Sequence, residues 1–131
     1  DTVQSSLEAF AILVQCIEPN IERMRSALEK GYIEATDVAE FLVIKGIPFR
    51  TAYQAAKRLV EHCIEEKKSL RSIAQADLSV HEAFDKAAID ARELAEYLDP
   101  VACVTRRSQI GGPAPERVAE QIERLRRFIA V

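Results

Sequence analysis

The side chains best suited to catalysis or metal binding are few and far apart in this sequence. Neither His62 nor His81 has a cysteine or a carboxylate at a spacing that would complete a metal site. Cys63 follows His62 directly, so these two side chains would point to different faces of a helix. We therefore interpret both histidines as solvated or helix-capping residues and expect no metal site.

Three cysteines occur, and none of them belongs to a CxxC pair. An odd number at such wide separations argues against a disulfide framework and against a zinc ribbon. We expect Cys16, Cys63 and Cys103 to be buried free thiols, in keeping with a reducing, cytoplasmic location.

Ser108 stands in a polar loop just before the glycine pair Gly111-Gly112. A serine nucleophile needs a neighbouring base and a hole of backbone donors, so a role in a turn is the simpler interpretation of Ser108. The glycines are not followed by a Lys-Ser/Thr pair and do not follow a predicted strand. They therefore do not form a phosphate-binding loop.

Two basic clusters remain, Arg106-Arg107 and the group Arg124, Arg126 and Arg127. Arginine can hold a carboxylate through two parallel hydrogen bonds, so a substrate or partner carboxylate is one interpretation. The alternative is a solvated face with ion pairs to nearby glutamates, namely Glu116, Glu120 and Glu123. The residues themselves assign no catalytic, cofactor-binding or metal-binding site.

The composition indicates what kind of chain must position these residues. The chain has 131 residues, of which 48% are hydrophobic and 30% charged, and this balance argues against intrinsic disorder. Its net charge of −3 removes any general electrostatic attraction to nucleic acid or anionic membranes. The longest apolar run, from Ala9 to Val14, is far shorter than the roughly 20 residues of a membrane span.

The periodicity of the apolar residues predicts an all-α chain that begins with one long bundle helix. A heptad pattern with gaps of 4, 3, 4, 3, 4, 3 and 4 runs through Val3, Leu7, Phe10, Val14, Ile17, Ile21, Met24 and Leu28. We expect one helix from Thr2 to Glu29, roughly 40 Å long and kinked at Pro19 rather than divided into two. Gly31 is expected to stop it.

The same helix is expected to be an interface. Ile12 and Leu13 lie off the heptad pattern, and apolar residues on more than one side require more than one neighbour. Helices of other chains are one source of neighbours, and packing inside a single subunit is the alternative. The candidate helix-bundle interface consists of Leu7, Phe10, Val14, Ile17, Ile21 and Met24.

The remaining sequence predicts several shorter helices. Thr36 is expected to cap a helix that Gly46 ends, and Pro48 is expected in the first turn of the next helix. The buried residues of that second helix are expected to be Phe49, Ala52, Ala56, Leu59, Val60, Cys63 and Ile64. Capping patterns headed by Ser79, Asp90 and Asp99 predict helices near 80–87, 91–97 and 100–106, and a last helix is expected near 115–129 with Val118, Ile122, Leu125 and Ile129 facing inward.

Two stretches resemble a known family. Residues 35–50, ATDVAEFLVIKGIPFR, resemble the start of the small C-terminal domain of argininosuccinate lyase. Leu98-Asp99-Pro100, Val104, Arg107, Gly111-Gly112 and Ala114-Pro115 resemble the end of that domain, in the family's order and separation. Asp1-Thr2-Val3 and Ile21-Glu22-Arg23-Met24 resemble the end of the preceding central helix. Tyr53-Gln54 and Pro113 depart from the pattern.

The resemblance implies a parent enzyme that cleaves argininosuccinate to arginine and fumarate by β-elimination in arginine biosynthesis. It implies a homotetramer built around a helical bundle, with no organic cofactor and no metal. The family's catalytic loop, Gly-Ser-Ser-x-Met-Pro-x-Lys-x-Asn, does not occur in this chain, so no catalytic residue is carried over. We expect a non-catalytic C-terminal piece of a longer polypeptide, with residues 1–31 from the central bundle and 32–131 as the small domain.

Two other functions stay open at this point. The helix–Gly–helix spacing of residues 36–61 also occurs in DNA-binding modules, and Arg50, Lys57 and Arg58 could meet phosphates. The acidic total charge argues against that function, and we expect neither nucleic acid nor a membrane as partner. A free-standing helical interaction domain that dimerises through its first helix is the other alternative.

Overall fold

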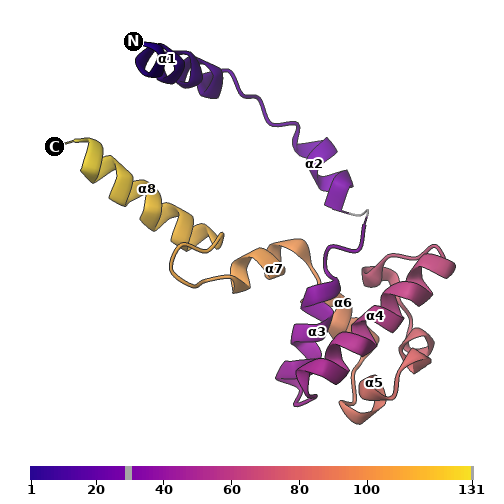
Figure 1. Cartoon of the computed structure of the whole chain (residues 1–131). Coiled ribbons are helices and arrows are strands. Elements are labelled where there is room, and N and C mark those ends of the chain that lie inside the picture. The colour runs from indigo at the N-terminus through magenta and orange to yellow at the C-terminus, as the bar shows by residue number, and fades with distance from the viewer. Residues whose placement is uncertain (29–30, 131) are drawn as a thin grey trace.

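The computed structural model describes residues 1–28 and 31–130, and these ranges hold helices and connecting turns without a strand (Figure 1). This confirms the predicted all-α class. The elements are α1 (Thr2–Gln15), α2 (Ile21–Leu28), α3 (Ala35–Ile44), α4 (Phe49–Glu65), the 3-10 helices η1 (Leu70–Ser72) and η2 (Gln75–Val80), α5 (Glu82–Lys86), α6 (Ala91–Tyr97), α7 (Pro100–Arg106) and α8 (Pro115–Ile129). The predicted helix end at Glu29 lies outside the described residues, as does Val131.

The prediction of one continuous, kinked first helix is wrong. α1 ends at Gln15, and residues 17–20 are not helical before α2 begins at Ile21. Pro19 has no N–H to donate, and a proline disfavours helical geometry at the residue before it, here Glu18. Asn20 then starts α2 anew, because its side-chain oxygen accepts a hydrogen bond of 2.9 Å from the backbone N–H of Arg23.

A small helical domain forms the core, and every residue of the core cluster lies between positions 38 and 98. α3 packs against α4, while η1, η2, α5 and α6 pack around this pair (Figure 1). The largest fully buried side chains are Phe84, Leu42, Leu59, Leu70, Leu78, Leu94 and Leu98, with Val38 and Cys63. This domain therefore has its own hydrophobic core without any contribution from α1, α2 or α8.

Local capping chemistry sets several boundaries of this domain as predicted. Asp90 accepts hydrogen bonds from two backbone N–H groups at the start of α6, and Asp99 does the same for α7. Gly46 ends α3 with φ +93°, and the next backbone N–H, of Ile47, returns to the carbonyl of Leu42 at 3.0 Å. The predicted helix over 115–129 is confirmed as α8.

Other caps differ from the prediction. Thr36 lies inside α3, whose first turn begins after Glu34 without a side-chain cap. Pro48 stands at the N-cap of α4, one position before the helix, rather than within its first turn. Ser79 lies inside η2, and His81 caps α5 instead, because its ring nitrogen accepts from the N–H of Ala83 at 3.1 Å. The interpretation of His81 as a capping residue is confirmed.

The predicted burial also needs correction. Phe49 and Ile64 of α4 are exposed, and Ala55 takes a buried place that was not predicted. Phe49 opens α4 with its ring centre 6.3 Å from that of Tyr53, and Ile64 lines a hollow near the end of α4 instead of the core. Cys16 is exposed because it ends α1, which has no neighbour here, whereas the other two cysteines are buried as expected.

Candidate functional site

The most conspicuous feature of the molecule is a pair of helical arms with uncovered apolar faces. The N-terminal arm comprises α1 and α2, and the C-terminal arm is α8. Both project away from the small domain (Figure 1). α1, α2 and α8 contain no buried residue within the described part of the chain.

The candidate interface residues all lie on the N-terminal arm. The structure places Leu7, Phe10 and Val14 on α1, Ile17 in the connection, and Ile21 and Met24 on α2. Each of them is exposed, with 64% of Leu7 and 61% of Phe10 open to solvent. Ile12 and Leu13, on the second face of α1, are exposed as well. Water would surround all of these side chains in an isolated chain, which is unfavourable for such large apolar surfaces.

The C-terminal arm also exposes large apolar side chains to solvent. Val118, Ile122, Leu125 and Ile129 were predicted to face inward, but all four are exposed. They lie along one side of α8, and its opposite side carries most of its charged residues. The prediction failed because α8 leaves the small domain instead of folding onto it (Figure 1).

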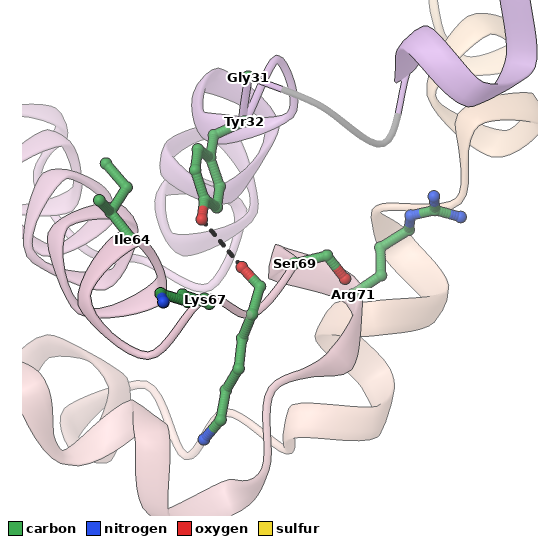
Figure 2. Close-up of a pocket in the computed structure, with 7 residues that line it drawn as sticks. Gly31, Tyr32, Ile64, Lys67, Ser69 and Arg71 are labelled. Carbon is green, nitrogen blue, oxygen red and sulfur yellow. Dashed lines mark hydrogen bonds between the residues drawn. The ribbon is translucent and has the colours of Figure 1, made fainter. Parts of the chain in front are cut away.

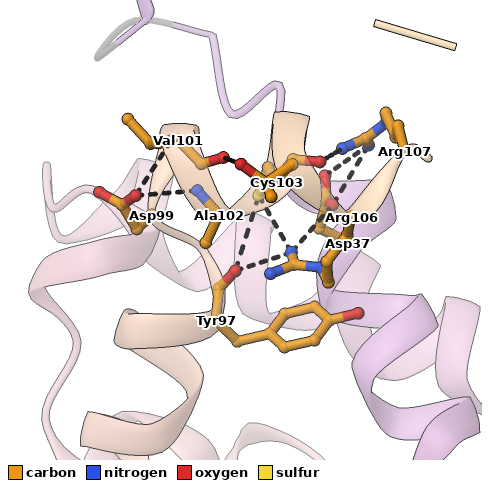
Figure 3. A network of polar contacts seen from close by, with 9 residues as sticks. Asp37, Tyr97, Asp99, Val101, Ala102, Cys103, Arg106 and Arg107 are labelled. Carbon is orange, nitrogen blue, oxygen red and sulfur yellow. Dashed lines mark hydrogen bonds and ion pairs between the residues drawn. The ribbon is translucent and has the colours of Figure 1, made fainter. Parts of the chain in front are cut away.

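A cluster around Asp37 ties α7 to α3. Asp37 is buried near the start of α3, and Arg107 donates from one nitrogen to both of its carboxylate oxygens, at 3.1 and 3.0 Å (Figure 3). Arg106 adds a longer ion pair of 3.5 Å to the same carboxylate. The hydrogen bond to Asp37 raises the pKa of the Arg107 guanidinium. The cluster therefore fastens two segments that lie 70 residues apart.

Aromatic and sulfur contacts extend this cluster. The Arg106 guanidinium lies 3.5 Å from the centre of the Tyr97 ring and donates to the Tyr97 carbonyl at 2.8 Å (Figure 3). Tyr97 packs in turn on Phe41 of α3, with ring centres 4.6 Å apart. Burial raises the pKa of the Cys103 thiol, so this thiol is held in its unreactive, protonated form.

A second cluster surrounds Asp77 in η2. Its carboxylate contacts the His62 ring at 2.8 Å and Lys68 at 3.0 Å, and it accepts a backbone hydrogen bond of 2.7 Å from Ala74. These hydrogen bonds hold the pKa of Asp77 well below its usual range, and the bond with His62 has the largest effect. A carboxylate held so firmly ionised and so fully bonded is a poor proton acceptor, and we interpret this cluster as a support for the α4–η2 contact.

A hollow of about 600 Å³ lies where the chain enters the small domain. It is lined by Tyr32, Ile64, Lys67, Ser69 and Arg71, with Gly31 and Lys68 (Figure 2). The Tyr32 hydroxyl donates to the Lys68 carbonyl at 3.0 Å, which connects the entry segment to the end of α4. Among the described residues, this lining contains neither a histidine nor a carboxylate to act as a base beside its serine, so they supply binding groups but no nucleophile with a base.

The arginines and the serine that the sequence offered as functional candidates bond to other groups of the chain. Arg126 pairs with Glu123 on α8 at 2.9 Å, as expected for a solvated face, whereas Arg106 and Arg107 pair with the distant Asp37 instead. In the described residues, Ser108 makes only backbone hydrogen bonds, so nothing activates its hydroxyl.

Two of the three side chains that the DNA-binding alternative expects to meet phosphates have an acidic neighbour. On α4, Lys57 and Arg58 both lie near Glu61, at 3.7 and 3.5 Å. Among the described residues, no group of three or more potential ligands could hold a metal ion, and no helix is long and apolar enough to cross a membrane.

Comparisons with known proteins agree with one another. A family model described as argininosuccinate lyase C-terminal matches residues 32–105. Relatives named argininosuccinate lyase include those of Moorella thermoacetica (39% identical over 130 residues), Clostridium beijerinckii (35% over 130) and Synechococcus sp. CC9605 (40% over 133). These alignments cover 99%, 99% and 97% of this chain but only 27%, 27% and 26% of the relatives. The chain thus spans about a quarter of the length of the curated relatives it matches.

Proposed function

The chain belongs to the argininosuccinate lyase family, as its C-terminal region, and from this premise we propose that it serves a parent enzyme that cleaves argininosuccinate to arginine and fumarate. The proposed reaction is a β-elimination. A base removes a proton from the carbon next to a carboxylate, and the electron pair forms the double bond of fumarate as the bond to the guanidinium nitrogen breaks. Arginine leaves with that nitrogen. The reaction takes place in the cytoplasm and needs no cofactor.

In this proposal the chain itself is not catalytic and acts through packing and subunit assembly. The observation that carries this role is the N-terminal arm, whose heptad pattern is exposed along its whole described length. A helix without any buried residue gains its packing energy only when another helix covers it. Other subunits of a homotetramer would supply such helices, and an isolated chain would associate with itself through residues 3–28.

Sedimentation of the 131-residue chain tests this role. Phe10→Glu puts a charge on the heptad face and is expected to convert associated chains into monomers. Gln15→Glu introduces the same charge on the polar side of α1, which also carries Gln4 and Glu8, and is the matched control, which should still associate. Strictly monomeric wild-type chains would contradict the proposed interface.

Enzyme activity is tested separately, through the ultraviolet absorbance of fumarate released from argininosuccinate. The purified chain is expected to show no turnover, because it holds no serine activated by a base within its described part. Turnover by the chain alone would overturn the non-catalytic role. Reading the coding sequence upstream of Asp1 completes the test, since the proposal requires a loop of the type Gly-Ser-Ser-x-Met-Pro-x-Lys-x-Asn there.

Neither nucleic acid nor a membrane is part of this proposal. A mobility-shift titration at low salt, where electrostatic binding to DNA is strongest, is expected to show no complex. Saturable binding would favour the DNA-binding alternative instead.

A further inference from the structure

We propose that the turn between α7 and α8 is a rigid elbow, which fixes the direction of the C-terminal arm relative to the small domain. The elbow consists of residues 107–114, and Gly112 is the residue that allows it to close (Figure 1). This inference concerns how α8 is connected and not what covers it, so it does not rest on the proposed assembly role.

The requirement for glycine at position 112 is steric. The φ of Gly112 lies outside the left-handed region, so its backbone conformation does not by itself demand a glycine. A Cβ at this position would lie 2.2 Å from the carbonyl oxygen of Arg107 and 2.9 Å from that of Gln109. Both are backbone atoms and cannot turn away as the end of a long side chain could. Any side chain at position 112 therefore forces the turn to open.

Hydrogen bonds close the same turn from within. The N–H of Gly112 donates to the carbonyl of Gln109 at 2.8 Å, and the N–H of Ala114 donates to the carbonyl of Arg107 at 3.4 Å. Ala114 is buried, and a proline stands on each side of it. Because a proline ring fixes its own φ, few backbone rotations remain between the end of α7 and the start of α8.

Side chains anchor both ends of the elbow. At its start, Arg107 donates to the carbonyl of Cys103 at 2.6 Å and to the carboxylate of Asp37, which ties the elbow to α7 and α3 (Figure 3). Beyond its end, Arg117 in the first turn of α8 donates back to the carbonyl of Ser108 at 2.5 Å. A side-chain contact therefore holds α8 to the beginning of the elbow, in addition to the backbone.

The elbow matters because α8 has no other anchor on the small domain. α8 contains no buried residue in the described structure, so a flexible connection would let it swing freely. A rigid elbow instead presents the apolar side of α8 in one direction. Covering a preset surface costs less conformational entropy than first ordering a mobile one.

Pulsed electron paramagnetic resonance between two spin labels tests the elbow. The labels are attached at Gln54→Cys on α4 and Arg124→Cys on α8, both exposed, in a Cys16→Ser background because Cys16 is the exposed native thiol. Dilution with unlabelled chain removes distances between copies. We expect one narrow distance peak with the native elbow and a roughly twofold broader distribution in Gly112→Ala. Ile110→Ala, at an exposed residue of the same turn, is the control and should keep the narrow peak.

Arg117→Gln is a second variant, and it leaves the backbone of the turn intact. It removes the guanidinium that reaches the carbonyl of Ser108, so we expect a distribution between those of the native elbow and Gly112→Ala. Urea denaturation shows in parallel whether the small domain of each variant is folded. If Gly112→Ala does not fold, Arg117→Gln decides the test alone.

Three results would overturn the proposal. A broad distribution with the native elbow would show that the turn is a hinge. Narrow peaks in both Gly112→Ala and Arg117→Gln would show that these contacts do not set the direction of α8. Equal broadening in Ile110→Ala would remove the special role of Gly112, because any change in the turn would then release the helix.

Discussion

Asp37 offers the sharpest test of what holds the C-terminal part of the chain to the small domain. Its carboxylate is 4% exposed and receives two hydrogen bonds from Arg107, at 3.1 and 3.0 Å, with Arg106 at 3.5 Å. Asp37→Asn keeps the shape of the side chain but removes its charge and one acceptor. The amide group then faces a guanidinium, which can only donate.

The magnitude follows from these contacts. A hydrogen bond to a charged group contributes about 1.5–3 kcal/mol, and breaking a fully buried ion pair costs about 3–5 kcal/mol. The Arg107 side chain is 37% exposed, so water compensates part of the loss and the lower range applies. We expect Asp37→Asn to lower the free energy of unfolding by about 2 kcal/mol, which corresponds to a fall in Tm of roughly 10 °C for a domain of this size.

Urea denaturation followed by circular dichroism measures this loss. Glu40→Gln, an exposed carboxylate one turn further along α3, changes the net charge equally and should stay within about 0.5 kcal/mol of wild type. Arg107→Lys keeps the positive charge but loses the planar guanidinium, which bonds Asp37 through one nitrogen and the Cys103 carbonyl through the other, so its free energy of unfolding should lie between those of these two variants. An Asp37→Asn chain as stable as Glu40→Gln would refute the reasoning, because the ion pair would then behave like an ordinary surface contact.

Two further predictions follow from the charge and burial of single residues. The pKa of Asp77 is depressed in the folded chain, so its stabilising contribution is complete above the unfolded pKa of about 4 and is lost as the pH falls below that value. The difference in unfolding free energy between wild type and Asp77→Asn should therefore shrink between pH 6 and pH 3. A constant difference would contradict the assignment. A maleimide should label Cys16 at once in the native chain, whereas Cys63 and Cys103 should react only after unfolding. Rapid labelling of all three thiols would show that the small domain does not protect Cys63 and Cys103.

Features that depend on a few neighbouring residues were predictable from the sequence. The Asp90 and Asp99 caps, the glycine stop at Gly46 and the bounds of α8 all follow from local hydrogen bonding and backbone geometry, and the structure contains each of them. The break at Pro19 is also local, but the unbroken heptad pattern argued for continuity. Side-chain periodicity reports which residues share a face, and it does not report whether the backbone hydrogen bonds persist between them.

Features that depend on distant residues were not predictable in this way. Asp37 shows no special pattern in its own helix, and its partner Arg107 comes 70 residues later, so only the fold reveals the pair. Asp77 and His62 meet because η2 packs on α4, which no sequence spacing indicates. The burial of Phe49 was misjudged for the same reason: its neighbours are set by the packing of whole helices and not by α4 alone.

The position of the core gives the strongest physical reason to look for function in the arms. All core-cluster residues lie between 38 and 98, so α1, α2 and α8 contribute no side chain to this core. The arms nevertheless carry large apolar side chains at heptad spacing, and exposing them to water costs free energy that no contact among the described residues compensates. Such faces become favourable once other helices cover them, whether these belong to the rest of the same polypeptide or to another subunit. Their regular spacing on both arms fits the assembly role proposed above, in which helices outside the described residues cover these faces.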